Sequence, residues 1–199
     1  MAESFVERVC DINMEMRYVN GNSIVKPFYI GAFEVTQAQW YKIMNTSIVM
    51  QKNKVNPCVN LNSVGPNYPM YYVNWHETNE FCDTLSNVTG KRYRMPTEIE
   101  WEYAAHEKGT LNDIAWYADN SGNMIQPCGC KMPNKLGIYD MFGNLWEWCG
   151  DWYDRDGILR VIRGGAWNNH ASFCTNANRL FAMANSRNDY IGFRVVVEV

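Results

Sequence analysis

Four stretches of this sequence have patterns that helical or strand periodicity alone does not explain. They lie at residues 28–40, 94–105 and 136–149, and in a split pair at 163–167 and 191–194. Two adjacent glycines follow the arginine that opens the split pair, and such glycines let backbone pass close to backbone. Two tryptophans alternate with a glutamate near the end of the third stretch, a pattern typical of a half-buried strand. The set predicts a particular scaffold, although a scaffold by itself does not give a function.

In their order and spacing, the four stretches closely resemble the formylglycine-generating enzymes, also called sulfatase-modifying factors. Among the motifs that carry the resemblance are Arg163-Gly-Gly-Ala-Trp167, Ile191-Gly-Phe-Arg194 and the strand around Trp146 and Trp148. The resemblance covers nearly the whole chain and implies an α+β fold of C-type-lectin type, with two or three helices, short strands and much irregular structure. We find no linker, repeat or low-complexity tract, so we expect residues 1–199 to form a single domain.

Local signals predict three helices. Thr36, Asn74 and Thr97 each stand before an apolar run and have side chains of the kind that cap helix N-termini. The second helix should end at the Asn-Val-Thr-Gly sequence of residues 87–90. We also expect a strand at 28–36, a loop at 45–70, and short strands at 158–163 and 192–197.

Charge and hydropathy exclude several classes of partner. The formal net charge is −3 and no basic run occurs, so we expect no nucleic-acid partner. No apolar stretch approaches the roughly 18 residues that a membrane helix needs, so we expect no membrane insertion. The N-terminal residues do not resemble a secretory signal. We therefore expect a chain that is cytoplasmic as synthesised, with display on a phage or cell surface left open.

The seven cysteines lack the spacing of a small disulfide scaffold. We interpret most of them as buried or free thiols, and one disulfide remains open.

The resemblance also implies where catalysis would take place. The enzymes of the family carry two cysteines five positions apart just after the Arg-Gly-Gly motif, and this pair binds Cu(I), which prefers thiolates. The matching positions here are Asn169 and Cys174. An amide cannot supply the second soft, anionic ligand, so we predict that the chain is not an enzyme and requires no cofactor. The alternative is a catalyst of the same family with altered metal chemistry.

The chain also contains residues of the types that bind iron, zinc and calcium. Iron-dependent sulfoxide synthases resemble this family, but the histidines at 76, 106 and 170 lie far apart in sequence, and Cys128-Gly-Cys130 has no second pair at zinc spacing. In calcium-binding members of the family, an Asn side chain and backbone carbonyls before the Trp-Glu-Trp strand supply oxygens, which suit calcium. The matching residues form a candidate calcium site: Asn134, Lys135, Gly137 and Tyr139. Lys135 departs from the family pattern, because it replaces a glycine.

Residues 168–190, called the variable segment below, depart from the family pattern. Related bacterial sequences that lack the cysteine pair often carry a run of Asn here, whereas this chain keeps six Asn and adds large apolar side chains. Exposed apolar side chains in a row are unusual in a solvated loop, and aromatics mixed with Asn and Ser are typical of antibody paratopes. We therefore predict ligand binding by Asn168, Asn169, His170, Ser172, Phe173, Thr175, Asn176, Asn178, Leu180, Phe181, Ala182, Met183, Asn188, Asp189 and Tyr190.

The variable segment also resembles the variable proteins of diversity-generating retroelements, which mutate adenines in a template copy. An AAC codon for Asn, changed only at its adenines, encodes many of the residues found, including His170, Phe173 and Tyr190, whereas Met183 needs another starting codon. The resemblance implies a bacterial or phage protein that binds an unknown protein or cell-surface ligand. An invariant adhesion or structural module of the same fold stays open. We expect the side chains at 170, 173, 180, 181, 183 and 190 to share one exposed face.

Overall fold

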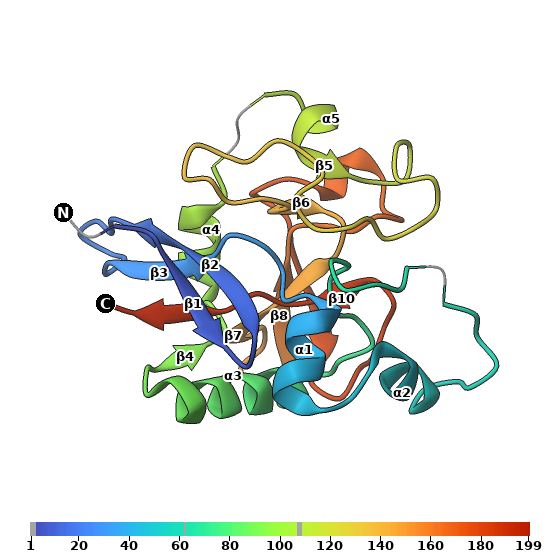
Figure 1. The fold of residues 1–199 in the computed structure, drawn as a ribbon. Coiled ribbons are helices and arrows are strands. Elements are labelled where there is room, and N and C mark those ends of the chain that lie inside the picture. The colour runs from blue at the N-terminus through green and yellow to red at the C-terminus, as the bar shows by residue number, and fades with distance from the viewer. Residues whose placement is uncertain (1–2, 62, 107–108) are drawn as a thin grey trace.

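Two sheets form the frame of the computed structural model, which describes residues 3–61, 63–106 and 109–199 (Figure 1). The first sheet is antiparallel, with the strand order β1 (Phe5–Val9), β2 (Ile12–Val19), β3 (Phe28–Gly31), β11 (Val196–Glu198) and β4 (Tyr93–Arg94). The second has the order β10 (Ile191–Gly192), β7 (Trp146–Trp152), β8 (Leu159–Arg163) and β9 (Arg179–Met183), and β10 runs parallel to β7. A short parallel pair joins β5 (Ala115–Trp116) to β6 (Phe142–Gly143). With its helices, this is the α+β class that the sequence predicts.

Three helices begin directly after the residues whose side chains predict them. Thr36, Asn74 and Thr97 each accept a hydrogen bond from the backbone N–H three residues later, within a capping box closed by Gln or Glu. The second of these helices ends at Gly90, which has the left-handed φ of 71° that glycine adopts without strain. The helices are α1 (Gln37–Met44), α3 (Trp75–Thr89) and α4 (Glu98–Ala104).

Several short elements are not predicted by the sequence. The hairpin of β1 and β2, the strand β9 and the helix α2 (Ile48–Asn53) have no counterpart in the sequence analysis, and α2 lies inside the expected loop. With α5 (Leu111–Ile114), the described residues contain five α-helices, more than the two or three expected. Elements this short depend on tertiary packing, so their local signals are weak. Among the described helices, none has both the length and the apolar character needed to cross a bilayer.

Large aromatic side chains fill the core. Trp101, Trp146, Trp148 and Phe193 are each at most 1% exposed. Residues 146–149 of β7 are all buried, so both faces of this part of the strand are covered. The alternation of Trp and Glu therefore does not mark a half-buried strand, and the buried Glu needs a partner.

That partner is Arg194. Its Nε and Nη2 atoms donate to the two carboxylate oxygens of Glu147 at 2.7 and 2.6 Å, and both side chains are almost completely buried. The guanidinium also donates to the carbonyl oxygens of Gly31 and Tyr139 at 3.0 and 2.9 Å. Because each charge is paired and hydrogen-bonded, the core tolerates the ion pair. The pair ties β3, β7 and the chain after β10 together.

Two further carboxyl groups lie buried near this ion pair. Glu34 accepts a hydrogen bond from Asn144 Nδ2 at 2.8 Å, and Asp140 accepts one from the backbone N–H of Gly129 at 2.7 Å. Each has a second carboxyl oxygen without a hydrogen-bond partner among the described residues. Burial, reinforced by the neighbouring carboxylates, raises the pKa of Glu34 well above its usual value and that of Asp140 to about 6. Glu34, Asp140 and Glu147 therefore share the positive charge of the Arg194 guanidinium. Ionising all three carboxyl groups at once is electrostatically unfavourable.

We predict that Asp140 makes the protein less stable as the pH rises from about 5 to about 8. The folded state keeps this proton up to about pH 6, whereas an unfolded Asp releases it near pH 4. The stabilisation is thus complete at low pH and is lost as the pH rises through about 6. Asp140→Asn keeps an acceptor for Gly129. Over this pH interval, its free energy of unfolding in urea should fall by about 1 kcal/mol less than that of the parent. Equal pH slopes for the two proteins would contradict the assignment.

Candidate ligand-binding site

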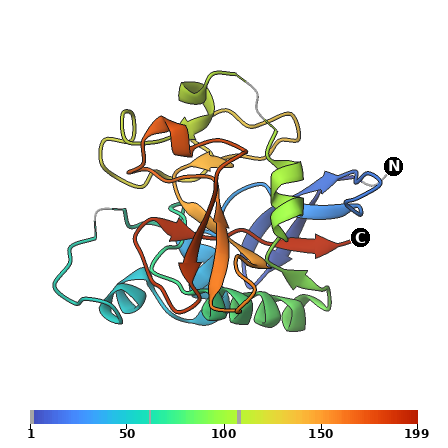
Figure 2. The same cartoon turned by 180° about the vertical axis from the view of Figure 1, so that it is seen from behind.

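The variable segment runs along one side of the molecule (Figure 2). It starts near β5, forms the one-turn helix η1 (Ala171–Phe173), continues as β9 at the edge of the four-stranded sheet, and ends in a loop beside the start of α3. An edge strand has one row of backbone groups that no neighbouring strand pairs with. The segment therefore lies at the rim of the scaffold and not inside it.

Backbone hydrogen bonds fix the two ends of the variable segment. Near its beginning, the N–H of Ala118 donates to the carbonyl of Asn169 at 2.9 Å. Near its end, the N–H of Tyr72 donates to the carbonyl of Asn188 at 3.0 Å. In both bonds the segment contributes only backbone, so these two bonds do not depend on which side chains the segment carries.

The structure divides the predicted contact residues into two groups. The exposed group consists of Asn168, His170, Ser172, Phe173, Leu180, Phe181 and Met183. The partly buried group consists of Asn169, Thr175, Asn176, Asn178, Ala182, Asn188, Asp189 and Tyr190. Among the exposed ones, Phe173, Phe181 and Met183 show 40, 44 and 63% of their surface to solvent, a large apolar area for one short segment.

The six large side chains do not all share one face, so that expectation is wrong. Leu180 and Phe181 are consecutive in β9, and consecutive side chains of a strand point to opposite faces of the sheet. Phe181 packs on Tyr153, with ring centroids 4.6 Å apart. Tyr190 packs against the core instead of facing solvent. The exposed group of side chains, from Asn168 to Met183, is called the rim below, and it lies along the edge of the sheet.

Residues outside the variable segment extend this rim, although the sequence alone does not point to them. Trp152 and Ile158 are 44 and 59% exposed, and they lie where β7 ends and just before β8 begins. Leu159, which follows Ile158, pairs with Met183 of β9. Strand register brings these residues to the variable segment, and a single sequence does not give that register. The only available signal is the aromatic pair at 152–153, just after the Trp-Glu-Trp strand.

The two positions that match the family's copper ligands do not fit a copper ion. Asn169 Oδ1 accepts hydrogen bonds from Trp146 Nε1 at 2.7 Å and from the N–H of Ala166 at 3.0 Å. Cys174 is 2% exposed, and burial raises the pKa of its thiol to about 12. Its sulfur lies so close to Gly165 that a Cβ there would be 2.7 Å away. With an engaged amide in place of one cysteine, these two positions offer at most one sulfur ligand and cannot replace two thiolates.

The candidate calcium ligands do not fit their ion either. The side-chain oxygen of Asn134 accepts two backbone N–H groups, at 2.9 and 3.1 Å. The carbonyls of Gly137 and Tyr139 accept from the guanidinium groups of Arg17 and Arg194 at 3.0 and 2.9 Å. Calcium needs free oxygens, whereas these oxygens face positive charge. In the ranges that the structure describes, no three His, Cys, Asp or Glu side chains gather closely enough to hold a metal ion.

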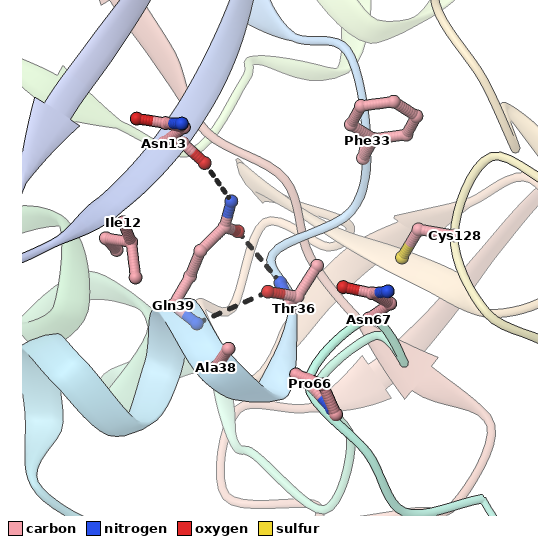
Figure 3. Close-up of a pocket in the computed structure, with 9 residues that line it drawn as sticks. All are labelled: Ile12, Asn13, Phe33, Thr36, Ala38, Gln39, Pro66, Asn67 and Cys128. Atoms are coloured by element: carbon pink, nitrogen blue, oxygen red, sulfur yellow. Dashed lines mark hydrogen bonds between the residues drawn. The ribbon is translucent and has the colours of Figure 1, made fainter.

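A hollow of about 380 Å³ lies away from the variable segment, where the start of β2 meets the start of α1 (Figure 3). Phe33 and Cys128 stand on one side of it. On the other side, the amide of Gln39 donates to the carbonyl of Asn13 and accepts from the N–H of Thr36, both at 2.9 Å. None of the residues found to line the hollow belongs to the variable segment. We therefore do not assign this hollow to the candidate site.

Comparison with known families and proteins supports a common ancestry with sulfatase-modifying factors. The family model described as "Sulfatase-modifying factor enzyme 1-like domain" matches residues 13–199. Chaperone protein LppX of Paenibacillus barcinonensis is 30% identical over 75% of this chain and 72% of its own length. The formylglycine-generating enzyme of Streptomyces coelicolor is 28% identical over 65% of this chain and 52% of its own. Inactive C-alpha-formylglycine-generating enzyme 2 of Bos taurus is 29% identical over 64% and 49%. The chain spans about half the length of the last two relatives.

Solved structures share the fold. Treponema denticola variable protein 1 matches with a TM-score of 0.84 over 100% of both chains, at 24% identity. The Major Tropism Determinant U1 variant matches with a TM-score of 0.58 over 94% of this chain and 56% of that one, at 13% identity. The C-type-lectin-like fold predicted from the sequence is confirmed.

We predict that Asn169 is required for stability although its neighbour Asn168 is not. Asn169→Ala would leave the buried indole N–H of Trp146 without an acceptor, which typically costs about 1–3 kcal/mol. Asn168 is exposed, so Asn168→Ala should change the unfolding free energy by less than about 0.5 kcal/mol. Urea unfolding of both variants checks this. Two variants of equal stability would show that the Asn169 amide is replaceable.

We also predict that calcium does not stabilise the protein. A ligand that binds the folded state raises the melting temperature by mass action, and the oxygens of Asn134, Gly137 and Tyr139 are already engaged. Lys135, at the position of a glycine, is exposed and adds a further positive charge to this turn. Melting curves in millimolar calcium and in excess EDTA should coincide. A rise in melting temperature with calcium, abolished by Asn134→Ala, would restore the calcium site.

Proposed function

The chain belongs to the sulfatase-modifying factor enzyme 1-like family, and we propose that it is a non-catalytic variable protein of a diversity-generating retroelement. Its variable segment would bind a protein or cell-surface ligand. The observation that carries the proposal is the exposure of Phe173, Phe181 and Met183 on a backbone that is held at both ends.

The residues at the family's copper positions argue against catalysis. The amide oxygen of Asn169 is committed to Trp146, and the thiol of Cys174 is buried with a raised pKa. Oxygen chemistry on a substrate cysteine needs a soft metal centre that is open to substrate. Neither residue offers an accessible thiolate, so binding is the simpler use of this surface.

The physical properties of the rim suit binding. Burying apolar surface contributes roughly 25 cal/mol per Å², and rigid aromatic rings contribute that area with little loss of side-chain entropy. Asn168 and Ser172 are exposed beside them and provide adaptable hydrogen bonds. The base of the strand is fixed, because Arg179 Nε donates to both carboxylate oxygens of Glu98 at 2.8 and 2.9 Å.

Similarity to proteins named for their variability supports the retroelement part of the proposal. Treponema denticola variable protein 1 matches along its entire length, and variants of the Major Tropism Determinant share the fold. In this chain, the residues that adenine mutation of Asn codons would produce gather between Trp167 and Ile191. The variation would then be confined to the rim, while the frame stays constant.

We predict that exposed positions of the rim tolerate randomisation. A library with random residues at Phe173, Phe181 and Met183 should consist mostly of folded proteins, since surface changes cost about 0.5 kcal/mol or less each. Panning this library against an arbitrary folded protein, such as lysozyme, should yield binders that differ at these positions. The fraction folded is measured by protease resistance of the displayed library, and binding by enrichment.

The matched control library randomises three buried positions, Trp148, Val161 and Phe193. It should be mostly unfolded, because truncating a buried Trp or Phe costs about 3–5 kcal/mol. If the rim library unfolds as badly, the segment is scaffold and the proposal fails. Copper-dependent conversion of a sulfatase-type cysteine peptide to an aldehyde by the purified parent would contradict the non-catalytic part.

A further inference from the structure

A narrow groove opens beside the C-terminal end of the variable segment. Its volume is about 70 Å³. Tyr71, Tyr72 and Trp167 are its aromatic lining residues, and Asp189 of the variable segment also lines it. Drug-sized ligands occupy pockets of about 300 Å³ or more, so this much smaller groove suits a slender chemical group.

Hydrogen bonds to the variable segment fix the shape of the groove. The indole N–H of Trp167 donates to the carbonyl of Asp189 at 3.1 Å, and the N–H of Tyr72 donates to the carbonyl of Asn188 at 3.0 Å. Tyr72 has a φ of 56°, a left-handed conformation that is costly for an aromatic residue. The bond to Asn188 helps to hold Tyr72 in that conformation, and Tyr72 is one of the residues that line the groove.

Among the described residues, no side chain donates a hydrogen bond to the carboxylate of Asp189, which is contacted by its own backbone N–H. No Lys or Arg is found among the described residues that line the groove. Arg187, two residues earlier, donates instead to the carboxylate of Glu77 and to the carbonyl of Tyr72. Partial burial raises the pKa of Asp189, because desolvation disfavours the charged form. A cation placed beside the carboxylate would offset that cost.

We propose that the groove takes a cationic side chain of a protein ligand, an ammonium or guanidinium group on an alkyl stem, with Asp189 as its counter-ion. This inference rests on the proposed function, because Asp189 belongs to the variable segment. The faces of Tyr72 and Trp167 attract cations as well as covering the alkyl stem. The small volume favours a slender group, and the carboxylate repels an anion, so a lysine or arginine side chain is the occupant that matches both size and charge.

The test is an NMR titration of the protein with butylammonium and butylguanidinium, which present the two head groups on the same stem. Both should shift the amide signals of Tyr72, Trp167 and Asp189 in a saturable way. Neutral 1-butanol and methyl glucoside should shift them far less. In Asp189→Asn, binding of the cations should weaken about tenfold or more, since the charge-assisted contact is gone.

Asp83→Asn serves as the matched control, because Asp83 is an exposed acid on α3 and its removal changes the net charge equally. It should leave the titration unchanged. The inference is overturned if neither cation shifts the groove signals, if 1-butanol shifts them equally, if methyl glucoside binds better, or if Asp189→Asn binds the cations as well as the parent.

Failure of this inference is distinguishable from failure of the proposed function. If rim-library binders tolerate Asp189→Asn and the cations do not bind, the variable segment binds ligands but the groove takes no cation. If the cations bind at Asp189 while the rim library unfolds and yields no binders, the groove is a cation site on a protein that is not a variable binder.

Discussion

Arg194 and Glu147 form an ion pair sealed from solvent, and separate parts of the chain converge on it. The guanidinium reaches the carbonyls of Gly31 and Tyr139, and the carboxylate also accepts the indole N–H of Trp101 at 2.8 Å. Removing one partner of such a pair typically costs about 3–5 kcal/mol, because the other charge stays buried and uncompensated. The pair joins β7 to the strand region that follows the variable segment, so the position where that segment returns to the core is set by an interaction to which it contributes nothing.

The first half of the segment is supported at an internal position, also by a guanidinium group. Arg163, at the end of β8 and nearly buried, donates to Glu98 and Glu102 of α4 at 2.8 and 3.1 Å and also to the backbone carbonyl of Asn176. Arg194 and Arg163 both belong to the frame. Arg163 contacts the segment through the backbone carbonyl of Asn176. A surface that must carry different side chains in different copies of a protein needs supports of this kind, because a backbone acceptor is present whatever residue bears it.

Much of the frame follows from the sequence, because its signals are local or carried by motifs. The caps Thr36, Asn74 and Thr97 predict three helices at their true starting points, and the four stretches predict the fold. Interactions between distant residues are not predictable in this way. Asn169 appears as one Asn among several in the sequence, yet its amide is a structural acceptor for Trp146. Tyr72 and Asp189 meet in one groove only through pairings across more than a hundred residues. The calcium positions match by motif, but two arginines from other parts of the chain occupy their oxygens.

The backbone bonds at Asn169 and Asn188 also constrain how the segment can evolve. Between these fixed points the chain must span a set path with a set number of residues, and β9 must keep its register with β8. A one-residue shift of that register would turn every side chain of the strand to the other face. A mutational process that exchanges bases without changing length avoids this damage. The structure thus ties the length and the path of the segment to the frame, while its exposed side chains at Phe173, Phe181 and Met183 carry little of that constraint.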